Sequence, residues 1–104
     1  MTRGDVLAIL RNVGTVDRDL SLQLFFVIHT GRSLRSSCSL RWDEVTEDKL
    51  AEVVRYAPLD YAPFIYKYRS ASRLSGRLKR AFRELGYREE IPIRELRLAY
   101  RRGE

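Results

Sequence analysis

The residues of this chain best suited to chemistry are a row of arginines between positions 69 and 85. Four of them, Arg69, Arg73, Arg77 and Arg80, recur at helical spacing and fall within an arc of roughly 80° on one side of a helix. We call these four residues the arginine stripe. Guanidinium groups one turn apart repel one another unless a negatively charged group lies between them. A guanidinium group can bind two phosphate oxygens at once, as a bidentate donor. The stripe therefore predicts contact with a nucleic-acid backbone; the alternative is a merely solubilising face.

The element that positions the stripe is an amphipathic helix, which we expect to begin near Ser70 or Ser72 and to end at Gly86. Its opposite face is apolar and is predicted to pack against a core. The apolar residues are Leu74, Leu78, Ala81, Phe82 and Leu85.

The charge of the chain supports the same interpretation. The 104 residues carry 20 basic and 14 acidic side chains, a formal net charge of +6. Residues 1–52 hold seven basic and eight acidic groups, whereas residues 53–104 hold thirteen and six. Arginine outnumbers lysine 17 to 3, which suits phosphate and guanine contacts. This asymmetry favours an anionic partner, duplex DNA above all, for the basic half of the chain at about residues 64–104.

Further basic residues of this half are predicted to contact DNA together with the stripe. The full predicted set is Lys67, Arg69, Arg73, Arg77, Lys79, Arg80, Arg83, Arg94 and Arg97. A second class of function stays open, in which the basic face binds an acidic protein partner as an inhibitor or assembly module.

Catalytic and metal sites are not predicted. His29 is the only histidine and Cys38 the only cysteine, so no zinc site of Cys/His type can form and no cofactor is expected. We expect His29 to be packed or hydrogen-bonded. The acidic residues at 43–48 raise a magnesium-dependent nuclease as a weaker alternative, but their position at the start of a predicted helix explains them.

The length predicts one domain, residues 1–104, and the pattern predicts a predominantly helical α+β fold. A first helix is expected from Met1 to Val13 with Gly14 as its stop, and Asp17 or Asp19 as the cap of the next element. Residues 20–29 fit either a strand or a buried helix. Another helix is expected from Thr46 to about Ala57.

Two alternating segments favour β-structure. Residues 33–42 alternate like the second strand of a hairpin, and residues 64–68 like a short strand. The tail at 91–100 alternates weakly.

Residues 25–31 (Phe-Phe-Val-Ile-His-Thr-Gly) and 40–45 (Leu-Arg-Trp-Asp-Glu-Val) together are similar to the first conserved box of tyrosine recombinases, the phage-integrase type. Residues 93–100 (Ile-Arg-Glu-Leu-Arg-Leu-Ala-Tyr) look like the second box of that family, with Arg97 at the place of its second catalytic arginine. The resemblance covers roughly residues 18–102. It implies that 20–42 form two helices and that the arginine helix lies along DNA.

The chain departs from the family pattern where the chemistry resides. Ser33 occupies the place of the first catalytic arginine, and Arg94 replaces the histidine that precedes Arg97. No residue occupies the place of the nucleophilic tyrosine, without which no covalent phosphotyrosyl intermediate forms. Lys67 is a possible remnant of the hairpin lysine. The resemblance thus implies a degenerate core of a mobile element or virus that binds DNA and does not cut it alone.

A weaker resemblance is to a winged-helix domain. Residues 70–86 are similar to its recognition helix and the following tail to its wing. That geometry places the helix in the major groove and the tail on the flanking backbone.

The location of the protein is predicted to be cytoplasmic, or the interior of a host cell. The single Cys38 fits a reducing compartment. The longest uninterrupted apolar run, residues 24–28, is far too short for a membrane span. No membrane partner is therefore expected.

Overall fold

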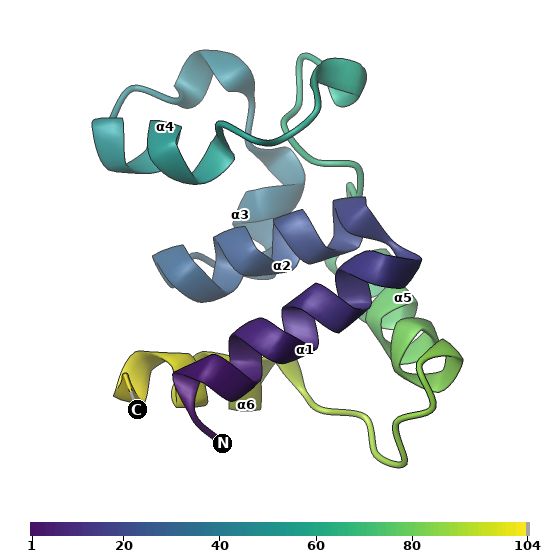
Figure 1. The fold of residues 1–104 in the computed structure, drawn as a ribbon. Helices are drawn as coiled ribbons and strands as arrows, with labels where there is room; N and C mark the ends of the chain where they lie inside the picture. Colours follow the sequence, from purple (N-terminus) through teal and green to yellow (C-terminus); the bar gives the residue numbers. More distant parts are fainter. Residues whose placement is uncertain (104) are drawn as a thin grey trace.

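The computed structural model describes residues 1–103. Its elements, in chain order, are α1 (Arg3–Val16), α2 (Arg18–Thr30), α3 (Leu34–Ser39), η1 (Trp42–Glu44), α4 (Asp48–Val54), η2 (Leu59–Tyr61), α5 (Ala71–Glu84) and α6 (Ile93–Arg102). Helices α1 and α2 fold back on each other, α5 and α6 pack against this pair, and α3 and α4 lie on its other side (Figure 1). The expectation of a predominantly helical fold is confirmed.

The sharp turn between α1 and α2 is made by a single residue, Asp17. It ends α1, and its carboxylate accepts the backbone N–H of Leu20 at 3.0 Å as the N-cap of α2. The predicted cap at Asp17 is therefore confirmed, whereas the predicted stop at Gly14 is wrong. Gly14 stays inside α1, where an added Cβ would lie only 3.3 Å from the hydroxyl of Ser21. Its missing side chain lets the two helices approach closely.

Helix α2 lies between two hydrophobic clusters. Leu20, Leu24 and Ile28 pack with residues of α1, α5 and α6. Phe26 and Val27 pack on the other side with α4 and the segment 65–66. Because the helix is covered on two faces, its sequence is almost continuously apolar, and this is why residues 20–29 fit both a strand and a buried helix.

Two β predictions are wrong. Residues 33–42 form the short helix α3, whose N-cap Ser33 accepts the N–H of Ser36, followed by η1 and not the strand of a hairpin. Residues 64–68 do not form a strand either. Within residues 1–103, the β component is one isolated bridge between Arg41 and Phe64.

The tail is a helix as well. Leu96, Ala99 and Tyr100 are buried, which is helical spacing, so α6 replaces the extended wing that the winged-helix resemblance implies. Helix α4 is shorter than expected and ends at Val54. Over residues 1–103, no helix combines the length and the apolar character needed to cross a membrane.

Candidate nucleic-acid interface

Three of the four residues of the arginine stripe, Arg73, Arg77 and Arg80, are carried by α5, which begins after Ser70. Arg69 precedes the N-cap, so its predicted place on the helix face is wrong. The hydroxyl of Ser70 accepts the backbone N–H of Arg73 at 3.2 Å, as an N-cap does. The apolar face of the helix is buried as expected, with Leu74, Leu78, Ala81 and Phe82 inside the core and Leu85 partly buried. The opposite side of the helix therefore faces outward, although the arginines of the stripe differ in their surroundings.

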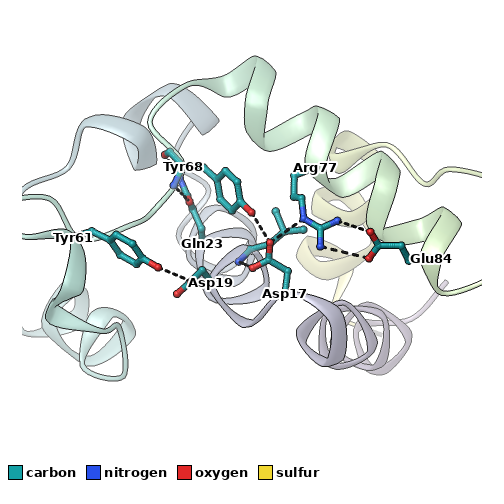
Figure 2. Close-up of polar contacts among 8 residues, drawn as sticks. Asp17, Asp19, Gln23, Tyr61, Tyr68, Arg77 and Glu84 are labelled. Atoms are coloured by element: carbon teal, nitrogen blue, oxygen red, sulfur yellow. Dashed lines mark hydrogen bonds and ion pairs between the residues drawn. The ribbon is translucent and has the colours of Figure 1, made fainter.

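Arg77 does not point freely into solvent, and its expected exposure is wrong. Only 14% of its side chain is exposed. Its Nε donates to a carboxylate oxygen of Asp17 at 3.0 Å, and its two terminal nitrogens face Glu84 at 3.3 and 3.4 Å (Figure 2). The positive charge of Arg77 is thus balanced by carboxylates of the chain itself. The contact with Asp17 also links α5 to the turn between α1 and α2.

Tyr68 completes this network, since its hydroxyl donates to the same oxygen of Asp17. Burial alone would raise the pKa of Asp17, but the hydrogen bonds from Tyr68, from the Leu20 N–H and from Arg77 bring that pKa below its ordinary value. Burial and the bond to Asp17 raise the pKa of Tyr68 to about 12. The network is therefore built for an ionised Asp17 and a neutral Tyr68.

The segment that carries Lys67 is fixed by a buried glutamine. Gln23 of α2 is 0% exposed, and its amide donates to the carbonyl of Tyr68 at 2.9 Å while accepting the N–H of Tyr68 at 3.2 Å. It also donates to the hydroxyl of Ser37 at 3.1 Å. This pairing imitates one rung of a β-ladder, so the neighbouring Lys67 is held beside α5 without a strand.

Arg69 is exposed, as expected, but two contacts fix its position. Its Nε donates to the carbonyl of Cys38 at 2.8 Å, and its guanidinium lies 3.1 Å from the centroid of the Phe64 ring. Both partners are uncharged, so Arg69 keeps its positive charge while its position is fixed.

Four of the predicted residues surround one open cavity of about 730 Å³ next to α5. Lys67, Arg73, Arg77 and Arg80 line it, together with Val16, Asp17, Tyr68 and Gly76. We call it the α5 cavity. Throughout residues 1–103, no carboxylate lies within 4.0 Å of a charged nitrogen of Lys67, Arg73 or Arg80. Asp17 is the only acid in the lining, and Arg77 already engages it.

The other predicted residues lie outside this cavity. Lys79 borders a separate groove beside Phe82, and Arg83 is paired with Glu90 at 3.3 Å. Arg94 and Arg97 line another hollow on α6, where Arg97 donates to the carbonyl of Arg32. The structure therefore divides the predicted set into one group around the α5 cavity and scattered basic residues elsewhere.

Two of the acidic residues at 43–48 are engaged locally. Asp43 pairs with Arg41 at 3.5 Å, and Glu44 accepts the N–H of Arg41 at 3.0 Å. In the described part of the chain, no three His, Cys, Asp or Glu side chains gather in a way that could hold a metal ion.

Sequence reasoning missed the role of three residues of this network: Asp17 and Tyr68, which line the cavity, and Glu84, which pairs with Arg77. Asp17 carried a signal as a helix cap, and Glu84 lies seven residues after Arg77, two turns along the same helix. The pairing of Tyr68 with Asp17 joins positions 51 residues apart, which no local pattern reveals.

Comparison with known proteins supplies no relative: no family model, no curated protein and no solved structure matches this chain.

Proposed function

We propose that this protein binds the phosphate backbone of duplex DNA through the α5 cavity. The observation that carries the proposal is the grouping of Lys67, Arg73 and Arg80 around one open cavity without a carboxylate partner among residues 1–103. Phosphate contacts of this kind supply affinity that depends little on base sequence.

The surroundings of the cavity suit such a ligand. Arg73 lies in the first turn of α5, where the helix dipole adds a partial positive charge. Arg77 is held by two carboxylates, so this part of the cavity wall is fixed before a ligand binds. Gly76 adds no side chain between these arginines, which leaves the helix backbone accessible to a phosphate.

The proposal is tested by the binding of a labelled duplex, measured by fluorescence anisotropy over a series of salt concentrations. Three neutralised phosphates give a slope of about −2.7 in log K against log salt, or roughly a 40-fold loss of affinity from 50 to 200 mM. A binding constant that stays flat over this range contradicts the proposal.

Charge reversal at two sites separates the placement of charge from its amount. Arg73→Glu with Arg80→Glu should abolish most of the binding, because both residues line the cavity without a carboxylate partner. The matched control is Arg11→Glu with Arg55→Glu, two exposed arginines outside the cavity that give the same change in net charge. Equal losses in the two variants would mean that only the overall field attracts DNA.

A pull-down experiment, combined with the DNA titration, addresses the second class of function, binding to an acidic protein partner. If duplex DNA is not bound and an acidic protein is captured from a lysate treated with nuclease, the basic face serves a protein partner instead. Arg77 is left intact in these variants because its replacement would disturb the fold.

A further inference from the structure

A second basic cavity lies at the opposite end of the α1–α2 pair, where α1 begins and α2 ends. Its volume is about 540 Å³, and its charged and polar lining includes Arg3, His29, Arg97, Tyr100 and Arg101. We call it the terminal pocket. No carboxylate side chain of the described residues lines it. Three arginines therefore face one hollow with no acid in its lining.

Arg3 is held in a fixed orientation by Tyr100. Its Nε and one terminal nitrogen donate to the carbonyl oxygen of Tyr100 at 3.0 and 2.8 Å, and its guanidinium lies 4.3 Å from the centroid of the Tyr100 ring. These contacts leave the other terminal nitrogen of Arg3 without a partner among residues 1–103. Since the carbonyl and the ring are uncharged, they orient the guanidinium and leave its charge available.

His29 is oriented by the same tyrosine. Its Nδ1 lies 2.8 Å from the hydroxyl of Tyr100, and its ring stacks on Phe25 with the centroids 5.2 Å apart. Its Nε2 makes no hydrogen bond within the described chain. Tyr100 itself is only 8% exposed, so a buried residue fixes both Arg3 and His29 at the pocket.

The remaining two arginines complete the lining. Arg97 donates to the carbonyl of Arg32, again an uncharged partner, and Arg101 is exposed in the last turn of α6. Arg101 makes no ion pair within residues 1–103. The pocket thus joins two oriented guanidinium groups, one exposed arginine and an imidazole nitrogen.

We propose that the terminal pocket is a second anion site that takes a phosphate group. A phosphate presents several oxygens to the donors of Arg3, Arg101 and His29 and cancels the charge that the pocket leaves unbalanced. The phosphate belongs either to a nucleic-acid backbone or to a small phosphorylated molecule, because both present the same oxygens. This proposal does not depend on DNA binding at the α5 cavity.

The test follows the ring signals of His29 by NMR while inorganic phosphate is added at constant pH and ionic strength. His29 is the only histidine of the chain, so its signals need no further assignment. We expect a saturable shift with a dissociation constant on the order of millimolar. No saturable shift up to about 50 mM phosphate overturns the proposal.

Variants locate the site. Arg101→Gln should weaken phosphate binding roughly 10-fold, and the addition of Arg3→Gln should remove it. Arg101 makes no hydrogen bond within residues 1–103, so its replacement alone tests the site even if the change at Arg3 disturbs folding. The matched control, Arg73→Gln with Arg80→Gln, should leave the shift unchanged. Equal weakening by the control and the pocket variants would also overturn the proposal.

The source of the phosphate is read from a second titration with short duplex DNA. The protein used is the Arg73→Glu, Arg80→Glu variant, in which the α5 cavity is disabled. If its His29 signals move with DNA, the pocket takes a backbone phosphate and the chain contacts DNA at two places. If they move with inorganic phosphate alone, the ligand is a small phosphorylated molecule. Failure of DNA binding at the α5 cavity leaves both readings of the pocket intact.

Discussion

The two ends of the α1–α2 pair use arginine in different ways. At the turn between the helices, Arg77 lies between the carboxylates of Asp17 and Glu84 and is largely buried. At the other end, Arg3 and Arg97 donate to backbone carbonyls and border an open pocket. In the first arrangement the carboxylates neutralise the positive charge of the arginine. In the second, the carbonyl groups only orient the guanidinium group.

This difference shows that the partner of an arginine decides its role. A carboxylate partner makes the guanidinium a structural tie between elements, and removing one side leaves a buried charge unpaired. A carbonyl partner also fixes the position of the side chain, but losing this hydrogen bond costs less stability, and the charge of the arginine remains available to a ligand. Of the arginine stripe, Arg77 belongs to the first kind, Arg69 to the second, and Arg73 and Arg80 face the cavity without a carboxylate partner.

The largest effect is expected at Arg77. Arg77→Glu places a third carboxylate beside Asp17 and Glu84, and we expect the free energy of unfolding in urea to fall by about 3–5 kcal/mol. Arg80→Glu should change it by less than about 0.5 kcal/mol, because Arg80 is exposed and makes no ion pair within the described residues. Similar losses in both variants would remove the distinction between structural and free arginines.

The pH dependence of stability sharpens the same comparison at Asp17. Its pKa is lowered in the folded protein, so the stability it contributes is present above its unfolded pKa near 4 and is lost as the pH falls through the lower folded value. Asp17→Asn keeps a capping side chain but not the charge. At pH 7 we expect the variant to be less stable by about 1–2 kcal/mol.

Urea unfolding between pH 7 and pH 2 provides the measurement for Asp17→Asn. The gap between the variant and the wild type should narrow below about pH 4 as Asp17 takes up its proton. A gap that stays constant over this range would show that the Asp17 charge does not stabilise the fold.

Local pattern predicted α1, α4 and α5, left α2 open, and failed at α3 and α6, where tertiary contacts decide. The apolar face of α5 and the cap at Asp17 follow from residues within two turns of each other. Residues 33–42 alternate in sequence, yet Ser33 caps a short helix, and Ser37 and Cys38 are buried beside Gln23. Alternation alone therefore cannot separate a strand from a helix that is covered on one side by a distant element.

For the candidate site, sequence predicted which residues are basic but not which of them stay without an acidic partner. Arg73, Arg77 and Arg80 are equivalent in the helical pattern, and the carboxylates of Asp17 and Glu84 distinguish Arg77. The terminal pocket was missed because it joins both ends of the chain, with Arg3 and Tyr100 separated by 97 residues. Figure 1 shows the start of α1 and the end of α6 lying close together, as the contact of Arg3 with Tyr100 requires.

A smaller effect is expected at the open end of the pair. Arg3→Gln removes two hydrogen bonds to the carbonyl of Tyr100 from an exposed side chain, and we expect a loss of about 1 kcal/mol in urea unfolding. Arg11→Gln is the control, since Arg11 is exposed on the same helix, and its change should stay below about 0.5 kcal/mol. A loss at Arg3 as large as that at Arg77 would mean that Arg3, too, is a structural tie.

The smallest effect is expected at Gly76, within the α5 cavity, where one substitution should change stability and DNA binding in opposite directions. Beyond its chain neighbours and the backbone of its own helix, no atom of the described residues lies within 4 Å of an added Cβ. The residue is in mid-helix, so Gly76→Ala should raise the free energy of unfolding by about 0.5–1 kcal/mol. If a phosphate approaches the helix backbone at this position, the added methyl group should also weaken DNA binding a few-fold, roughly 0.5–1 kcal/mol. The control is Ala substitution of Ser72, an exposed residue in the first turn of α5 that does not line the cavity. A variant at Gly76 that is more stable and binds DNA as tightly as the wild type would place the phosphate on the side chains of Arg73 and Arg80 alone, away from the helix backbone.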